Sequence, residues 1–448
     1  ENTGAALNHV VVVTVKQRLP HPNADKLSLC TVNDGQRDYQ IVCGAPNVAE
    51  GLNVPLAKEG AELPGGFKIK RSKIRGVESE GMLCSAEELG LPKGVDGLLV
   101  LDPSLAPGLP LAQALGLDDP VLTLETTANR PDHLSLRGLA REVSALGGLA
   151  LKDRTSDFAM PGPSSAADPG FAVHTDSQAC SYYSVRRVQG VRVGPSPDWL
   201  RHALEKSGIR SISNVVDATN CVLLEYGQPM HAFDASRISG GRLEARLARP
   251  GERIQTLDGQ ERVLEAEDVV IADAAGAQAL GGIMGGKLTE VTDSTTDLVL
   301  EAAVFAPKRI RRTARRLGLV SESGHRFERG VDALAVDEAM DRCVALILEI
   351  AGGKALGGRL SAGDKGGAPD AVALRPKEVN ALLGTRIADD EMVRLLQRRF
   401  FKVEASAETD PAGKAASPGQ NWRVSPPSWR RDVQGWADLA EEVLQMAG

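Results

Sequence analysis

The sequence lacks the long apolar runs of membrane proteins and the cysteine patterns of zinc or disulfide proteins. No apolar run approaches the roughly 18 residues that a membrane-spanning helix needs. The chain begins at Glu1 without the basic and apolar segments of a signal peptide, and we expect its natural start to be missing. None of the six cysteines belongs to a Cys-X-X-Cys pair. We therefore predict a cytoplasmic protein without a membrane partner.

The sequence also lacks an excess of positive charge. Its 52 basic and 59 acidic residues give a formal net charge of −7, which excludes a uniformly basic coat for nucleic acid. Two local basic clusters remain. The first contains Lys68, Lys70, Arg71, Lys73 and Arg75, and the second contains Lys308, Arg309, Arg311, Arg312, Arg315 and Arg316. Either cluster could neutralise phosphates or form a solvated face.

The composition and length are those of a folded protein of several domains. Hydrophobic residues make up 42% and charged residues 25% of the 448 residues, which is the normal range for globular domains. The length predicts about three domains. Residues 1–117 contain short strand-like runs separated by turns, which predicts a small barrel or sandwich. These runs are Val10–Val15, Leu27–Val32, Tyr39–Val42 and Val54–Ala57.

The rest of the chain divides at segments rich in glycine, proline and serine. Residues 118–160 contain a predicted helix at Arg137–Leu146 and lead into a linker. Residues 171–354 mix helix-like and strand-like segments. Residues 371–448 form a last small module, with a loop expected at Ala405–Gln420 and an amphipathic helix at the end.

The central region carries side chains suited to a pocket for a polar ligand. A helix-like segment contributes Thr219 and Asn220, and a Gly-Gln-Pro turn places His231 in a loop behind it. Glu301 ends a strand-like run. Taken singly, these residues also fit structural roles, such as a satisfied histidine or a surface carboxylate.

A glycine-rich run at 281–286, Gly-Gly-Ile-Met-Gly-Gly, lies between these residues in the sequence. Its glycines, Gly282 and Gly285 among them, offer backbone N–H groups that no side chain obstructs. The run is not a Walker loop, because no Gly-Lys-Ser/Thr follows it. The sequence also shows no clear Ser-His-Asp triad and no zinc site. Backbone donors are therefore the favoured means of binding a polar ligand.

The last predicted helix carries a set of carboxylates. Asp438, Glu441 and Glu442 follow the i, i+3, i+4 spacing that puts side chains on one helix face, and Asp432 lies just before the helix. Four converging carboxylates would form a hard oxygen site suited to Mg²⁺. The alternative is an acidic first turn that the helix dipole favours.

Several strings of residues resemble a known family. Three N-terminal blocks resemble the tRNA-binding OB-fold of several synthetases. They are 21–27 (His-Pro-Asn-Ala-Asp-Lys-Leu), 42–47 (Val-Cys-Gly-Ala-Pro-Asn) and 73–85 (Lys-Ile-Arg-Gly-Val-Glu-Ser-Glu-Gly-Met-Leu-Cys-Ser). Residues 124–142 are similar to the segment after the tRNA-binding insertion in the β subunit of bacterial phenylalanyl-tRNA synthetase. The central strings, at 214–234 and 281–286, resemble the editing domain of that subunit.

The resemblance implies a multidomain α+β fold. An OB-fold β-barrel for tRNA binding would occupy residues 1–117, and the remainder of an N-terminal B1 domain with a linker would occupy 118–160. A mixed α/β editing domain, called B3/B4, would occupy 171–354. A small α/β domain of winged-helix type, called B5, would occupy 371–448.

The resemblance also implies a site and its chemistry. In the family, the B3/B4 pocket hydrolyses tyrosine wrongly attached to phenylalanine tRNA. The positions carried over are Thr219, Asn220, His231, Gly282, Gly285 and Glu301. Glu301 would bind the tyrosine hydroxyl, and His231 would orient the water or the tRNA end. The cluster at Lys68–Arg75 would contact tRNA or remain a solvated hairpin.

The implied assembly is a phenylalanine–tRNA ligase, a heterotetramer of two α and two β subunits. Its α subunit would bind ATP and phenylalanine, and would share a Mg²⁺ site with Asp432, Asp438, Glu441 and Glu442. The chain, expected to be truncated at both ends relative to the family, would alone be at most an editing esterase. The alternatives are a tRNA-binding scaffold subunit with an unused pocket, or a stand-alone trans-editing hydrolase.

Overall fold

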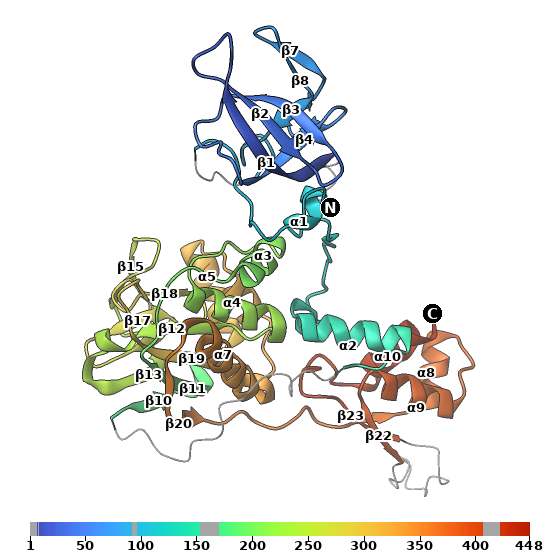
Figure 1. The fold of residues 1–448 in the computed structure, drawn as a ribbon. Helices are drawn as coiled ribbons and strands as arrows, with labels where there is room; N and C mark the ends of the chain where they lie inside the picture. Colours follow the sequence, from blue (N-terminus) through green and yellow to red (C-terminus); the bar gives the residue numbers. More distant parts are fainter. Residues whose placement is uncertain (1–6, 8, 92–95, 153–169, 406–421) are drawn as a thin grey trace, which may run out of the picture. The chain divides into compact units, whose positions relative to one another are not determined.

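The computed structural model describes residue 7 and residues 9–91, 96–152, 170–405 and 422–448. The chain divides into two compact units, Glu1–Leu124 and Glu125–Gly448 (Figure 1). Among the described residues, no helix is long and apolar enough to cross a membrane. The predicted linker before residue 171 and the predicted loop Ala405–Gln420 lie outside the described residues, apart from one residue at an end of each.

The first unit is built on a five-stranded antiparallel sheet in the order β3-β2-β1-β4-β9. Its strands are β1 (Val10–Pro20), β2 (Ser28–Asn33), β3 (Asp38–Cys43), β4 (Asn53–Lys58) and β9 (Gly81–Leu83). The four predicted strands are confirmed, and the barrel-like sheet confirms the OB-type fold. Strand β1 is buried on both faces, with Val10 and Val12 in one hydrophobic cluster and Val13 and Val15 in another. Burial on both faces explains the unbroken run of valines.

Two short hairpins of the first unit carry most of the first basic cluster. They are β5 (Glu62–Leu63) with β6 (Phe67–Lys68), and β7 (Ser72–Ile74) with β8 (Val77–Ser79). The loop that starts at His21 holds the second hairpin. His21 Nε2 lies 3.2 Å from the carbonyl oxygen of Ile74, and Asn23 Nδ2 donates to the carbonyl of Arg75 at 3.0 Å. A short helix, α1 (Leu111–Ala114), follows the barrel and buries Leu111 completely.

The second unit contains two packed sheets and a helical layer. The four-stranded antiparallel sheet β12-β19-β11-β20 consists of β12 (Met230–Asp234), β19 (Asp297–Phe305), β11 (Cys180–Gln189) and β20 (Lys354–Gly363). Its helical face is covered by α4 (Asn214–Tyr226) and α7 (Val336–Ala351), with α3 (Asp198–Lys206) beside them (Figure 1). Its other face packs on a sheet formed by β10 (Ala172–Thr175), β13 (Arg242–Leu247), β16 (Val269–Ala272), β17 (Ala277–Leu280) and β18 (Met284–Gly285). A small hairpin, β14 (Arg253–Gln255) with β15 (Glu261–Val263), precedes β16.

The alternation of side chains along β19 determines what faces the second sheet. Leu298 and Leu300 pack in the cluster with the helices α4 and α7, whereas Val299 and Ala303 pack in the cluster with the second sheet. Glu301 lies in phase with Val299 and Ala303. The carboxylate is therefore carried into the space between the two sheets.

The C-terminal module is a three-stranded sheet with three helices. Its strands, in the order β21-β23-β22, are β21 (Val372–Leu374), β23 (Trp422–Ser425) and β22 (Lys402–Ala405). Its helices are α8 (Pro376–Leu383), α9 (Asp389–Arg398) and α10 (Trp436–Ala447). The predicted small α/β module and its final amphipathic helix are confirmed.

The helix α2 (Leu136–Gly147) confirms the helix predicted at Arg137–Leu146 and lies against the C-terminal module (Figure 1). Ser135 Oγ accepts a hydrogen bond from the Gly138 N–H at 3.0 Å, which caps the first turn. Gly148, with φ of 63°, ends the helix in the left-handed conformation. Arg398 Nη2 donates to the carbonyl of Ala145 at 2.6 Å and joins α2 to α9.

Candidate functional site

A small cavity lies between the two sheets of the second unit and the helix α6 (Glu322–Phe327). Its volume of about 70 Å³ exceeds the roughly 10–15 Å³ that one water needs, so water has room beside its side chains. The lining includes His231, Gly282, Gly285 and Glu301. The structure thus brings four of the six predicted pocket residues together, although 70 residues separate His231 from Glu301 in the sequence.

Glu301 and His231 face each other across the β12–β19 pair. They are directly opposed in the antiparallel register, where Cβ atoms lie about 4.5–5.5 Å apart. Glu301 Oε2 accepts a hydrogen bond from Tyr183 Oη on β11 at 2.8 Å. Among the described residues, none donates a hydrogen bond to Glu301 Oε1. One carboxyl oxygen is therefore held in place, and the other remains for a ligand.

Burial shifts the pKa values of both titratable groups toward their neutral forms. It raises the pKa of Glu301 to about 7, against the opposing effect of the hydrogen bond from Tyr183. It lowers the pKa of His231 to about 4. At neutral pH the imidazole is therefore uncharged, and Glu301 exchanges readily between its protonated and ionised forms.

Replacing Glu301 with glutamine should change how stability depends on pH. The folded state keeps the Glu301 proton up to about pH 7, whereas the unfolded chain loses it near its ordinary value of 4.5. Wild-type stability from this group therefore falls as the pH rises through that window. Between pH 4.5 and about pH 7, the free energy of unfolding of E301Q should therefore rise by about 3 kcal/mol relative to that of the wild type.

Urea unfolding of both chains at about pH 5 and pH 8 measures this change. The lowered pKa of His231 makes stability rise with pH between about 4 and 6.5, but His231 is present in both chains. Its contribution largely cancels in the difference between them. A difference that stays constant with pH would contradict the raised pKa of Glu301.

The glycines of the run 281–286 are required by close packing. A Cβ atom on Gly285 would lie 2.5 Å from Cε1 of His231, and one on Gly282 would lie 2.9 Å from the rings of Phe305 and Phe327. Gly282 also has φ of 69°, which L side chains rarely adopt. The glycines therefore leave the backbone open to the cavity. They also let this segment pack closely against the imidazole of His231 and the rings of Phe305 and Phe327.

Thr219 and Asn220 are not among the residues that line this cavity, contrary to their predicted place. Both lie on α4, which packs on the opposite face of the sheet from Glu301. Thr219 is buried, and its Oγ1 donates to the carbonyl of Val216 in its own helix at 2.6 Å. Their place in a pocket with Glu301 stays a prediction, which the packing of α4 on the helical side of the sheet does not support.

The residues that sequence reasoning missed are Tyr183, Ser323 and Phe327. Tyr183 is completely buried on β11 and holds Glu301, while Ser323 and Phe327 line the cavity from α6. Arg326 on the same helix donates to the carbonyl of Leu134 at 2.8 Å. The signal for Tyr183 was weak, since any tyrosine in a strand also fits an ordinary core position.

Two of the predicted metal-binding carboxylates are held by arginines. Glu442 is 3% exposed, and its Oε1 accepts from Arg430 Nη2 at 2.5 Å, while Arg399 binds its Oε2. Asp432 accepts two hydrogen bonds from Arg430, at 2.9 and 2.8 Å. Although burial alone would raise it, the hydrogen bonds from Arg430 lower the pKa of Glu442. These carboxylates are neutralised inside the chain.

The other two predicted metal-binding carboxylates have local roles on α10. Asp438 Oδ2 accepts from the N–H of Gly435 at 2.8 Å and caps the helix, as an acidic first turn would. Glu441 accepts from Gln445 Nε2 one turn later, at 2.9 Å. No group of three or more acidic, histidine or cysteine residues in the described parts of the chain is placed to hold a metal. The predicted convergence of the four carboxylates is therefore not found.

In the first basic cluster, some cations are paired and others are free. Lys68 pairs with Glu62 at 3.4 Å, and Arg71 pairs with Glu78 at 2.7 Å. Three exposed cations of the cluster form no side-chain hydrogen bond or ion pair with the described residues: Lys70, Lys73 and Arg75. The ring of Phe67 is 61% exposed on β6 next to Lys68 in the sequence. The cluster thus offers free charges and one exposed aromatic ring.

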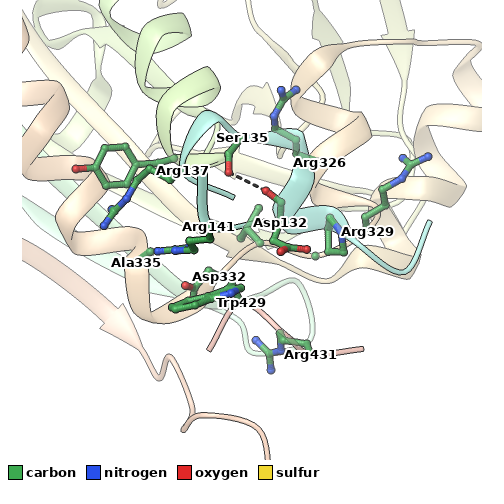
Figure 2. A pocket seen from close by; sticks show the side chains of 15 residues that line it. Asp132, Ser135, Arg137, Arg141, Arg326, Arg329, Asp332, Ala335, Trp429 and Arg431 are labelled. Carbon is green, nitrogen blue, oxygen red and sulfur yellow. Dashed lines mark hydrogen bonds between the residues drawn. The ribbon is translucent and has the colours of Figure 1, made fainter. Parts of the chain in front are cut away.

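A second cavity of about 50 Å³ lies where α2, α6 and the segment before α10 meet (Figure 2). The guanidinium of Arg141 stacks on Trp429, 3.6 Å from the ring centroid. Arg137 lies over Tyr226 in the same way at 4.5 Å and pairs with Glu338. These contacts join three parts of the second unit, and we assign this cavity a structural role.

Three family models match the chain in succession. The model described as "Putative tRNA binding domain" matches residues 10–110, the B3/4 domain matches 179–352, and the tRNA synthetase B5 domain matches 372–448. This series of domains, with the barrel and the sheet architecture above, defines a subunit of an aminoacyl-tRNA synthetase.

Comparison with curated sequences identifies the family. The chain is 46% identical over 449 residues to the phenylalanine–tRNA ligase beta subunit of Anaeromyxobacter dehalogenans, covering 100% of this chain and 55% of that protein. It is 45% identical over 451 residues to that of Geobacter metallireducens, covering 100% and 54%. The chain belongs to the family of phenylalanine–tRNA ligase beta subunits. It spans about half the length of the curated relatives it matches.

Among solved structures, the chain aligns with an N-terminal fragment of the phenylalanyl-tRNA synthetase beta-subunit from Pyrococcus horikoshii. The alignment covers 72% of this chain and 86% of the other, at 17% identity and a TM-score of 0.35.

Proposed function

We propose that this chain supplies the tRNA-binding and editing functions of a phenylalanine–tRNA ligase β subunit. The cavity at Glu301 would hydrolyse tyrosine esterified to phenylalanine tRNA. The observation that carries the proposal is the hydrogen bonding of the Glu301 carboxyl group. Tyr183 fixes its Oε2, and its Oε1 accepts no hydrogen bond from the described residues; Glu301 and His231 line the same cavity.

The carboxyl group explains how the site would select its substrate. Tyrosine differs from phenylalanine by one hydroxyl, which an apolar pocket rejects only by roughly 10²-fold. A site that pairs with the hydroxyl inverts that preference, since phenylalanine leaves a buried polar group without a partner. Glu301 Oε1 is that partner in this cavity.

Hydrolysis adds a water oxygen to the ester carbonyl carbon and breaks the bond from that carbon to the ribose oxygen. The proton of the water ends on the ribose oxygen, which releases tyrosine and uncharged tRNA. With its pKa near 4, His231 is a weak base at neutral pH and orients the water or the tRNA end. The N–H of Gly282 donates no hydrogen bond within the described residues and is a donor for the developing oxyanion.

The tRNA would also contact the first basic cluster. Lys70, Lys73 and Arg75 are free to neutralise phosphates, and Phe67 presents a ring on which a base can stack. One exposed ring supports a limited stacking contact, so electrostatic attraction would supply most of the affinity.

The wider assembly is part of the same proposal. The chain would work in the cytoplasm, in a heterotetramer of two α and two β subunits that attaches phenylalanine to its tRNA, with ATP bound by the α subunit. The placement of Asp432, Asp438, Glu441 and Glu442 does not fit a Mg²⁺ site formed by this chain alone. We therefore derive no chemical step through a metal ion.

Deacylation of Tyr-tRNA(Phe) by this chain, with Phe-tRNA(Phe) beside it, tests the proposal. We expect selective release of tyrosine, and release without the α subunit would show a self-sufficient pocket. The second candidate is a scaffold subunit with an unused pocket, which the extensive arginine network around α2 and α10 favours. Absence of tyrosine release, even from the full-length β subunit with its α partner, would overturn the editing function in favour of the scaffold.

A further inference from the structure

The helix α5 (Pro307–Leu317) carries the second basic cluster, and the structure divides its six cations into two sets. Arg309 pairs with Glu267, and Arg316 pairs with Asp268, so both are bound to the segment before β16. The other four are exposed and form no hydrogen bond or ion pair with the described part of the chain. They are Lys308, Arg311, Arg312 and Arg315, called here the α5 basic face.

The α5 basic face is a continuous strip on one side of the helix. Its residues follow the i, i+3, i+4, i+7 spacing, and the strip is about 10 Å long at 1.5 Å per residue. The opposite side is anchored, because Ile310 is completely buried and Thr313 Oγ1 donates to Asp268 Oδ1 at 2.7 Å. The strip is therefore held facing solvent.

No acidic side chain among the described residues pairs with the four charges of the α5 basic face. Two pairs of like charges stand four residues apart, Lys308 with Arg312 and Arg311 with Arg315, and each costs the helix roughly 0.2–0.5 kcal/mol. The acidic neighbours on the segment before β16 are bound to Arg309 and Arg316 instead. A polyanion would relieve this repulsion, whereas a single small anion could not reach both ends of the strip.

The helix α5 is packed directly on the wall of the Glu301 cavity. It begins two residues after β19 ends at Phe305. The ring of Phe305 contacts that of Phe327, which lines the cavity, with ring centroids 4.9 Å apart. Ile310 packs in the same hydrophobic cluster as both rings. The helix that carries the basic face is thus joined to the cavity lining through one hydrophobic cluster.

We propose that the α5 basic face binds the backbone phosphates of the RNA whose end enters the Glu301 cavity. This inference rests on the proposed function, because it takes the ester in the cavity to be attached to an RNA. Such a contact neutralises phosphate charge and positions the RNA, but it does not recognise the base sequence. An acidic protein surface is the alternative occupant, and the test separates the two.

The test is equilibrium binding of uncharged tRNA(Phe) to the full chain at several salt concentrations. The variant is Lys308→Gln with Arg312→Gln. The control is Lys377→Gln with Arg386→Gln, which removes the same charges from exposed positions that have no side-chain partner in the described residues. We expect the variant to reduce the slope of log K against log salt by roughly 1.5, for two lost phosphate contacts. At low salt its affinity should fall about tenfold, and the control should match wild type.

Equal slopes and affinities in the variant and the control would overturn the inference, and would leave the acidic protein surface as the occupant. Hydrolysis of Tyr-tRNA(Phe) is measured in parallel at saturating tRNA, where the variant should keep the wild-type rate. A binding defect without hydrolysis in any chain would contradict the proposed function alone. Hydrolysis with unchanged tRNA binding would contradict the α5 contact alone.

Discussion

Replacing Arg430 with alanine should lower the free energy of unfolding by about 3–5 kcal/mol, because it removes one partner from a buried ion network. Arg430 is 2% exposed and binds both Glu442 and Asp432 through its guanidinium. Arg399 continues the network from Glu442 to Glu142 on α2, at 2.5 Å from Arg399 Nη2 to Glu142 Oε1. Removing Arg430 leaves carboxylates buried with too few partners.

The measurement is urea unfolding followed by tryptophan fluorescence. Three of the four tryptophans, Trp422, Trp429 and Trp436, lie in the C-terminal module and report on this region. The control is Arg431→Ala, since Arg431 is exposed and adjacent in the chain, and it should change stability by no more than about 0.5 kcal/mol. Equal effects of the two substitutions would show that the network adds no stability.

Much of the fold could be predicted from local patterns in the sequence. The valine run at Val10–Val15 and the run Tyr39–Val42 became β1 and β3, because β-branched and aromatic residues suit a pleated, buried surface. Ser135 and Gly148 bounded α2 as a cap and a left-handed terminus. In each case, residues adjacent in the chain determine the structure.

The site depended on contacts that local patterns cannot show. Helical spacing placed Asp438 on one helix face with Glu441 and Glu442. It could not reveal that two arginines, Arg399 and Arg430, already bind Glu442. Likewise, the glycine run and His231 suggested a pocket, while only the pairing of β12 with β19 puts His231 opposite Glu301. Strand register and long-range ion pairing are tertiary properties, which the sequence resemblance anticipated only in part.

Replacing Glu301 with alanine should abolish the preference of the pocket for tyrosine. Losing the carboxyl partner of the hydroxyl should reduce Tyr-tRNA(Phe) hydrolysis by roughly 10–100-fold, since such hydrogen bonds contribute about 1.5–3 kcal/mol. Phe-tRNA(Phe) hydrolysis should not fall in parallel, because the variant leaves no buried carboxyl group unpaired. The ratio of the two kcat/KM values, measured by deacylation, should therefore approach one.

The variant Glu301→Gln separates hydrogen bonding from charge, and Glu349→Ala serves as the control. Glutamine keeps the size of the side chain and can pair with the hydroxyl, so E301Q should retain part of the preference. Wild-type discrimination should change with an apparent pKa near 7, the raised value of Glu301, whereas E301Q should show no such dependence. Glu349 is exposed on α7, on the helical side of the sheet, and its removal should leave both rates unchanged. Retained discrimination in E301A would mean that the tyrosine hydroxyl is read by another group.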